Sequence, residues 1–210
     1  MKICFLITAA GQSLRMGYHK ALMPIRGLPA AIYLASKVNK NIAQKVFITL
    51  PLDLMIDLGL KNALNSHRVS RRINMYPKHG YSGSVISIID EIFDDFHGMI
   101  ITPIDSPFGS KALLMTIKNL ATLYQNEKCI IVPCFGPLVG HPIYFSRHFF
   151  LTLKHAQRLG GLRGVMASNK KFVRKFYYPC ARILANINAP ADLLRCRNHI
   201  HTNFKGNAEI

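Results

Sequence analysis

The sequence predicts an α/β fold in which a doubly wound, mostly parallel sheet is covered by helices on both faces. Three observations predict this fold. The chain has 210 residues, and half of them are apolar, which suits one domain with a large core. Apolar runs of strand length recur along the chain, and segments with apolar residues at helical spacing separate them.

Five apolar runs have the length and continuity of buried strands. They lie at Ile3–Thr8, Val46–Leu50, Ile73–Tyr76, Met99–Pro103 and Cys129–Pro133. Continuous apolar runs are typical of strands that are buried on both faces, as in a parallel sheet. Four segments between them predict the crossover helices: Ala30–Val38, Leu54–Leu64, Val85–Phe93 and Ala112–Leu123.

The order of elements changes after Gly140. Four further segments follow: a short strand at Pro142–Phe145, a helix at His148–Leu159, and strands at Phe172–Tyr178 and Ile183–Ile187. Pro190–Cys196 predicts a final helix, because proline is favoured in the first helical turn. No linker is apparent, so residues 1–200 are expected to form one domain and the mostly polar residues 201–210 a frayed tail.

The composition excludes several classes of protein. No apolar run reaches the roughly 18 to 20 residues of a membrane-spanning helix, and the apolar content is too high for a disordered chain. The five cysteines are odd in number and include no C-x-x-C pair, which argues against a disulfide scaffold or a structural zinc site. Such cysteines suit a reducing cytosol, so we expect a cytoplasmic protein without membrane partners.

The chain is strongly basic, with a formal net charge of +17. Residues 141–210 hold 12 Lys or Arg against two acidic residues. Clustered cations can bind nucleic acid through counterion release. We favour the alternative, a solvated surface or a site for a polyanionic small molecule, because the densest run, residues 170–175, is interleaved with aromatic residues whose face a strand would partly bury.

The most informative segment follows the first strand and runs from Thr8 to Lys20. Its small residues Ala9, Ala10 and Gly11 let backbone N–H groups approach a ligand closely, and Arg15 and Lys20 supply cations a few residues later. The segment is neither a P-loop nor a G-x-G-x-x-G dinucleotide loop. It has the chemistry of a triphosphate-binding loop, although an ordinary glycine loop with two solvated cations would look similar.

Residues 8–29 resemble the L-A-A-G-x-S-x-R-M-G-x-x-K-x-L-L-P-x-x-G-x-P signature of the MobA-like nucleotidyltransferases. The resemblance is strongest to the branch that makes the cytidylyl form of the molybdenum cofactor. Further elements follow in family order: a G-x-x-x-S turn at residues 80–85, an aspartate element at 104–107, G-H-P at 140–142, a glycine and arginine turn at 160–166, and a closing D-x-D-T-P-E-D-L-like segment at 186–193. The resemblance therefore implies a single Rossmann-like domain of the nucleotide-diphospho-sugar transferase type.

The resemblance implies that a phosphate oxygen of an acceptor attacks the α-phosphorus of a nucleoside triphosphate and releases pyrophosphate. A phosphate nucleophile is already ionised near neutral pH, so catalysis can come from positioning and charge neutralisation. Arg15, Lys20 and Asp105 would be catalytic. The nucleotide would be held by the first loop and the G-x-x-x-S turn, at Thr8, Ala9, Ala10, Gly11, Arg15, Lys20, Gly80 and Ser84. His141 of the G-H-P element would orient the acceptor.

The resemblance also implies a magnesium ion, held by Asp105 and Asn188. Asp105 follows an apolar run, at the strand end where open α/β sheets bind their ligands, although Asp before Ser-Pro is also a common turn residue. The family's closing segment usually offers carboxylates where this chain has Asn186 and Asn188. An amide oxygen can also ligate Mg²⁺, and losing a negative charge should weaken the affinity unless phosphates supply the difference.

Several alternatives remain open at the level of sequence. Ala10 in place of a second glycine resembles the branch that uses CTP, whereas L-A-G-G loops occur in the guanylyl branch. The acceptor is molybdopterin, a sugar phosphate or another phosphorylated metabolite, and Asn186 and Asn188 also suit a nucleotide-binding protein that has lost catalysis. Ser84 at a predicted helix start is an N-cap or a ligand contact, and Gly80 approaches the ligand or simply makes the turn.

Overall fold

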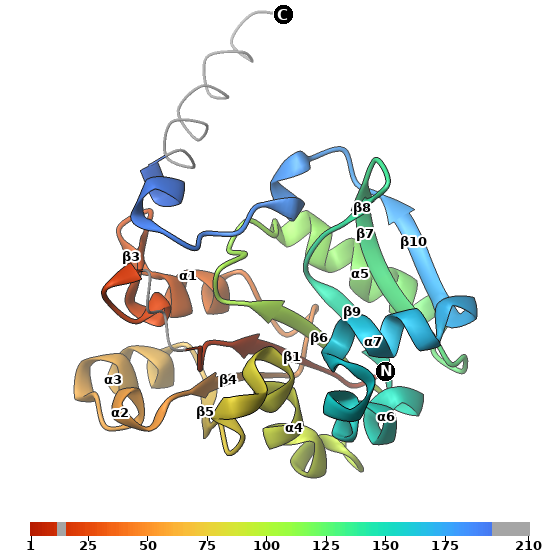
Figure 1. Ribbon diagram of the computed structural model, residues 1–210, viewed down its shortest axis with the longest axis horizontal. Coiled ribbons are helices and arrows are strands. Elements are labelled where there is room, and N and C mark those ends of the chain that lie inside the picture. The colour runs from red at the N-terminus through yellow and green to blue at the C-terminus, as the bar shows by residue number, and fades with distance from the viewer. Residues whose placement is uncertain (12–15, 195–210) are drawn as a thin grey trace, which may run out of the picture.

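The computed structural model describes residues 1–11 and 16–194, and a mixed sheet forms its centre (Figure 1). Seven strands run across this sheet in the order β10, β7, β9, β6, β1, β4, β5, and β8 pairs with β7 off this path. Their bounds are β1 Ile3–Thr8, β4 Lys45–Leu50, β5 Val69–Ile73, β6 Gly98–Pro103, β7 Ile130–Phe135, β8 Leu138–Val139, β9 Ile143–Ser146 and β10 Val173–Tyr177. A separate small hairpin consists of β2 (Pro24–Ile25) and β3 (Leu28–Pro29).

Among the seven strands that run across the sheet, one interrupts an otherwise parallel arrangement, and the short β8 is antiparallel to β7 beside them. β1 pairs in parallel with both β4 and β6, β4 pairs in parallel with β5, and β10 with β7. β9 lies between β6 and β7 and is antiparallel to both. The first residues of β9 therefore lie at the same edge of the sheet as the last residues of β1 and β6.

Helices cover both faces of the sheet and form two cores. One core lies under α1 (Ala30–Ser36), α3 (Leu58–Ser66) and α5 (Lys111–Leu123), and it takes Ile3, Phe5 and Ile7 from β1. The other lies under α4 (Gly80–Ile92), α6 (Phe150–Lys154) and α7 (Gly161–Ser168), and it takes Cys4 and Leu6. Because successive side chains of a strand point to opposite faces, burying both faces requires the continuous apolar run that the sequence has.

The predicted fold class is confirmed, and four of the five predicted buried strands lie where the sequence places them. The fifth prediction, Ile73–Tyr76, is wrong: β5 spans Val69–Ile73, and the chain bends at Met75. The Asn74 side-chain oxygen accepts from the Tyr76 N–H (2.9 Å) in place of a strand partner. β5 lies at one edge of the sheet. An edge strand tolerates polar residues, so β5 lacks the continuous apolar run by which a buried strand is recognised in the sequence.

Two predicted helices are each broken into shorter pieces. The segment predicted at Leu54–Leu64 forms α2 (Leu52–Met55) and α3, because the Asp57 carboxylate accepts the Leu60 N–H (2.6 Å) and caps a new helix. The segment predicted at His148–Leu159 forms α6 between two 3-10 turns. The second turn ends at Gly160, whose φ of +80° suits glycine and stops the helix.

The strand predicted at Ile183–Ile187 is also wrong. Residues Ala181–Leu184 form a 3-10 turn, and residues 185–188 form no ladder with another strand. The Ile183 carbonyl accepts from the His141 N–H (3.0 Å), and the Ile187 N–H donates to the Asp105 carbonyl (2.8 Å). These single bonds tie the segment to two loops, and its buried isoleucines give the apolar signal that resembles a strand. The predicted final helix begins as expected, since residues 190–194 are helical, and the tail at 201–210 lies outside the described residues.

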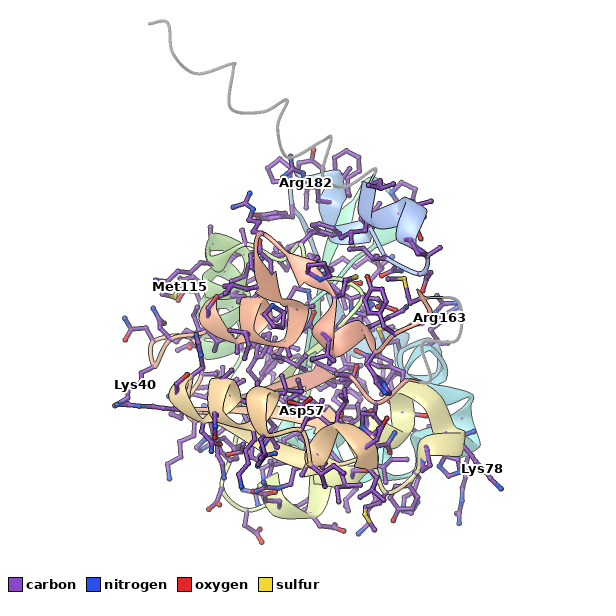
Figure 2. All side chains as sticks on the ribbon, turned by 90° about the vertical axis from the view of Figure 1, so that its left-hand side faces the viewer. Lys40, Asp57, Lys78, Met115, Arg163 and Arg182 are labelled. Carbon is purple, nitrogen blue, oxygen red and sulfur yellow. The ribbon has the colours of Figure 1, made fainter. Side chains whose placement is uncertain are left out.

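The densest basic run of the last third, residues 170–175, points its cations outward. Lys170, Lys171, Arg174 and Lys175 are exposed, whereas Phe172 and Phe176 between them are half-buried. Elsewhere, Lys40 and Lys78 extend away from the body of the molecule (Figure 2). None of the helices in the described part of the chain combines the length and apolarity needed to cross a membrane.

Candidate functional site

A cleft of about 940 Å³ lies at the edge of the sheet where β1 and β6 end and β9 begins. Predicted site residues from five separate segments line it: Thr8, Ala10, Gly11, Lys20, Gly80, Ser84, Asp105, His141, Asn186 and Asn188. Ala9 differs from its neighbours, because its side chain is buried in the core beneath the loop. Arg15, the remaining predicted residue, lies outside the described residues.

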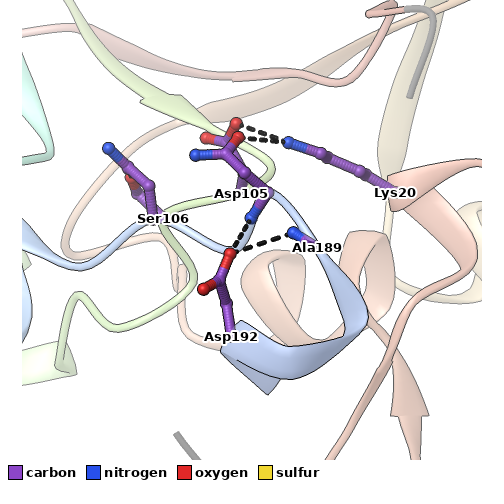
Figure 3. Close-up of polar contacts among 7 residues, drawn as sticks. Lys20, Asp105, Ser106, Ala189 and Asp192 are labelled. Carbon is purple, nitrogen blue, oxygen red and sulfur yellow. Dashed lines mark hydrogen bonds and ion pairs between the residues drawn. The ribbon is translucent and has the colours of Figure 1, made fainter. Parts of the chain in front are cut away.

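Lys20 and Asp105 form an ion pair in the cleft (Figure 3). The Lys20 ammonium lies 3.0 Å from Asp105 Oδ2 and donates to Asn188 Oδ1 at 2.8 Å. The Lys20 side chain is 14% exposed and that of Asp105 is 26% exposed, so both are partly shielded from water yet reach the cleft. The three residues come from distant parts of the sequence, and the fold brings their polar atoms together.

The segment that carries Asn186 and Asn188 is fixed to the Asp105 loop by several bonds. The Ile187 N–H donates to the Asp105 carbonyl, and the Ser106 hydroxyl donates to Asn186 Oδ1. Asp192 Oδ2 accepts from the backbone N–H groups of Asn188 and Ala189, each at 2.9 Å (Figure 3). The Asn188 side chain is therefore presented to Lys20 from a backbone with a defined position.

The first turn of α4 forms another wall of the cleft. Gly80 has a φ of +53°, a conformation that favours glycine, and Ser82 is bonded to the His79 carbonyl (2.9 Å) and to Gln157 (3.0 Å). Ser84 lies in the second turn, buried, with its hydroxyl 3.5 Å from Asn74 Nδ2. The N-cap interpretation of Ser84 is therefore wrong, because the helix begins at Gly80 and His79 occupies the cap position.

Gly83 has no room for a side chain. A Cβ at this position would lie 2.1 Å from the Tyr76 carbonyl oxygen, whereas one at Gly59 of α3 would lie 3.4 Å from the nearest atom, Asp57 Oδ1. We expect Gly83→Ala to destabilise the protein by about 1–3 kcal/mol, because backbone must move to admit the methyl group. The melting temperature should fall by several degrees.

Gly59→Ala is the matched control for this substitution. It adds the same methyl group to α3, where the new Cβ would be in ordinary van der Waals contact with its nearest neighbour. Because alanine favours a helix more than glycine does, the melting temperature should stay unchanged or rise slightly. Thermal unfolding followed by circular dichroism compares the two variants. Equal melting temperatures would show that the α4 turn is not held as tightly as the geometry indicates.

His141 lies in the loop before β9, with its ring edge-on to Tyr81 at a centroid distance of 6.2 Å. Burial lowers the pKa of His141 to about 4, opposed by the Asp105 carboxylate and reinforced by Arg163, so the ring is neutral at pH 7. Burial, reinforced by Asp105, raises the pKa of the Tyr81 phenol. His141 Nδ1 and the Tyr81 hydroxyl are both buried and have no hydrogen-bond partner within residues 1–11 and 16–194. Buried polar atoms of a purely structural pair are normally hydrogen-bonded.

The structure adds residues that sequence reasoning did not assign to the site. Tyr81, Gln157 and Arg163 all line the cleft. Arg163 stands in the first turn of α7, two residues after Gly161, and both Gly160 and Gly161 have a φ of +80°. The glycine pair followed by arginine was the only local signal for this wall, because the sequence alone does not place α7 beside α4.

The donor set suits a hard cation that arrives with phosphate. Within residues 1–11 and 16–194, no group of three or more His, Cys, Asp or Glu side chains could hold a metal ion. The cleft instead offers the Asp105 carboxylate and the Asn188 amide oxygen. Mg²⁺ characteristically binds one or two carboxylates and completes its shell with phosphate oxygens and water, so these residues fit it.

Comparison with known proteins identifies a family that this chain resembles. A model of the MobA-like NTP transferase domain matches residues 5–172. No curated protein matches the chain significantly in sequence.

Several solved structures share the fold at low sequence identity. Rv0371c from Mycobacterium tuberculosis is 21% identical, with a TM-score of 0.75 over 94% of this chain and 99% of that protein. It has also been solved in complex with manganese. A nucleotidyl transferase from Methanothermobacter is 19% identical, with a TM-score of 0.76 over 96% and 99%.

Molybdopterin-guanine dinucleotide biosynthesis protein A from Archaeoglobus fulgidus is 14% identical, with a TM-score of 0.66 over 96% of this chain and 100% of that one. Identities this low show the common fold, and the family match covers most of the chain, including the first loop and the Asp105 strand. This chain therefore belongs to the MobA-like NTP transferase family.

Proposed function

We propose that the protein transfers a nucleoside monophosphate from a nucleoside triphosphate, with CTP favoured, to a phosphorylated acceptor such as molybdopterin, with release of pyrophosphate. The observation that carries this proposal is the Lys20 ammonium held between Asp105 and Asn188 in a cleft at the end of β1 and β6. A shielded cation beside a short loop of small residues is suited to a polyphosphate. The unpaired thiols of the described cysteines are compatible with a cytosolic location.

Lys20 is the residue that we assign to the phosphates. Its ammonium can move from the protein oxygens to phosphate oxygens and stabilise the charge that develops on departing pyrophosphate. Arg15 is assigned the same role on the strength of the motif. The attacking group is an acceptor phosphate that is ionised at neutral pH, so the transfer requires no general base.

We assign the cation site to Asp105, with the Asn188 amide oxygen as the second protein ligand. A bound Mg²⁺ would supply Lewis-acid stabilisation of the triphosphate charge. Asp105 follows the end of β6, beside the loop after β1, so its carboxylate lies near where the triphosphate would bind. Thr8, Ala10, Gly11, Gly80 and Ser84, which line the cleft, are assigned to the nucleotide. Ala9 is not, because its side chain is buried in the core and its N–H donates to the Thr49 carbonyl (3.0 Å).

His141 is assigned to the acceptor. The order β1, β6, β9 along the sheet places Asp105 between the first loop and His141. In an in-line displacement the attacking and leaving oxygens lie on opposite sides of the phosphorus. If the first loop holds the leaving pyrophosphate, the acceptor approaches from the side of His141, whose neutral ring can accept or donate a hydrogen bond.

The assay that tests the function is pyrophosphate release. The protein is incubated with each nucleoside triphosphate, Mg²⁺ and either molybdopterin or a panel of sugar phosphates. We expect release that depends on both the nucleotide and one acceptor. Acceptor-independent release would indicate simple hydrolysis, and no release with any acceptor would contradict a working transferase.

The base preference is a separate prediction. We expect CTP to bind more tightly than GTP, because Ala10, which lines the cleft, stands where the guanylyl branch has a second glycine. Isothermal titration calorimetry with each nucleotide and Mg²⁺ measures the two dissociation constants. A clear preference for GTP would assign the protein to the guanylyl branch instead.

A second candidate is a nucleotide-binding protein without catalysis. The observation that favours it is the single carboxylate among the described cleft residues, with amides at 186 and 188. Such a protein would bind nucleotide through the same loop and release no pyrophosphate.

A further inference from the structure

The balance of charge in the cleft differs from that expected of a site built around a metal ion. Among the described residues that line the cleft, Asp105 is the only carboxylate, and Lys20 and Arg163 are cations. Asp105 is already paired with Lys20 at 3.0 Å, and His141 is neutral at pH 7. The described walls of the cleft therefore carry a net positive charge before any divalent cation binds.

Asn188 is a neutral residue at the position where a carboxylate would change this balance of charge. Its amide oxygen accepts a hydrogen bond from the Lys20 ammonium at 2.8 Å, the distance of a strong contact, but it adds no negative charge. An aspartate in the same place would have nearly the same shape. It would form a second ion pair with Lys20, so the ammonium would face two carboxylates. These two carboxylates would repel a triphosphate unless a cation were bound to them first.

The backbone around Asn188 is held by bonds that an exchange of asparagine for aspartate would not disturb. Its backbone N–H donates to Asp192, and the preceding Ile187 N–H donates to the carbonyl of Asp105 itself. Neither bond involves the Asn188 side chain. Exchanging the amide for a carboxylate should therefore change the charge beside Lys20 without moving the segment.

We propose that Asn188 is a positioning residue that holds Lys20 without adding a second negative charge beside it, and that the cleft consequently binds the nucleoside triphosphate without a divalent cation. The cation is then required for transfer and not for binding. This inference rests on the proposed function, because it takes the triphosphate as the ligand of Lys20. The hydrogen bond from Lys20 uses one lone pair of the Asn188 amide oxygen, and the second lone pair remains available to a cation that enters with the phosphates.

The test is equilibrium binding of CTP and GTP by calorimetry, in EDTA and in Mg²⁺, at fixed ionic strength. For the wild type we expect the dissociation constants in EDTA to lie within about tenfold of those in Mg²⁺. For Asn188→Asp we expect the EDTA value to rise by at least about tenfold, through the added charge at hydrogen-bond distance from Lys20, and Mg²⁺ to restore most of the loss.

Asn39→Asp is the matched control. Asn39 lies outside the cleft, and its side-chain oxygen accepts from the Asn41 N–H (3.1 Å), which a carboxylate can also do. This variant carries the same change in net charge, so a general charge effect would lower nucleotide affinity in it as well. We expect binding by Asn39→Asp to match the wild type in both conditions.

The outcomes separate the inference from the function on which it rests. Wild-type protein that binds nucleotide in Mg²⁺ but not in EDTA would overturn the inference and leave the proposed function intact. Equal affinities of the wild type and Asn188→Asp in EDTA would also overturn it, because Asn188 would then not control the site. Failure to bind any triphosphate in either condition would contradict the proposed function together with the inference.

Discussion

Lys20→Ala is expected to lower pyrophosphate release by at least about tenfold, and by as much as about a hundredfold. Each hydrogen bond to a charged group contributes roughly 1.5–3 kcal/mol, and the phosphate charge grows as pyrophosphate departs. The structure also alters the expected effect on stability. Lys20 is paired with Asp105, so its removal should lower the melting temperature modestly, where a cation facing only the ligand would leave it unchanged. Steady-state kinetics and thermal unfolding measure the two effects.

Lys154→Ala is the matched control for this substitution. Lys154 forms an ion pair with Asp90 at 2.6 Å that is more exposed than the Lys20–Asp105 pair, and neither residue lines the cleft. Turnover by this variant should equal that of the wild type, since only an exposed ion pair is lost. Normal turnover by Lys20→Ala would mean that the phosphates are bound elsewhere.

Asp105→Asn is expected to abolish most of the turnover while nucleotide binding persists. The substitution keeps the shape of the side chain and removes the only carboxylate among the described residues of the cleft, so a divalent cation would face the phosphates with amide oxygens alone. Nucleotide should still bind, because Lys20 retains its charge and loses a competing anion. Titrating pyrophosphate release against Mg²⁺, with calorimetry for binding, distinguishes the two effects.

Asp90→Asn controls for loss of a carboxylate outside the cleft. Asp90 is ion-paired with Lys154 at the surface, and its substitution should leave the Mg²⁺ dependence unchanged. Full activity of Asp105→Asn would show that the cation is bound at another place. If wild-type protein releases no pyrophosphate while Asn188→Asp does, the chain is a nucleotide-binding protein that has lost catalysis.

The strands were predictable where burial on both faces left no alternative. β1, β4, β6 and β7 lie within about two residues of the predicted runs, because a strand covered by helices on both sides must be apolar at successive positions. β5 was misplaced because, as the edge strand, it carries Ser70, Arg71 and Arg72 in its middle. The segment at 183–187 gave the opposite error, since its isoleucines are buried against loops and not in a ladder.

The residues of the site also differ in how far the sequence could identify them. The loop from Thr8 to Lys20 and Asp105 could be singled out because their chemistry is local: small residues and cations after one strand, and a carboxylate after another. Asn186 and Asn188 could be singled out only through the resemblance of residues 186–193 to the family's closing segment. Tyr81, Gln157 and Arg163 were not assigned to the site from the sequence. Tyr81 and Arg163 lie in segments that resemble family turns, at 80–85 and 160–166, but the part of all three side chains in the cleft depends on which helices lie side by side.

The sequence by itself determined the fold class, four of the buried strands and the loop of small residues and cations after the first strand, because hydrophobic periodicity and loop chemistry act over a few residues. Only the tertiary structure decided that β9 enters antiparallel between β6 and β7, which places His141 at the edge where β6 ends. It also decided that Lys20 meets Asp105 across 85 residues and Asn188 across 168. Contacts at such separations depend on the order of strands in the sheet, and that order is chosen by the packing of the whole chain, which no local pattern records.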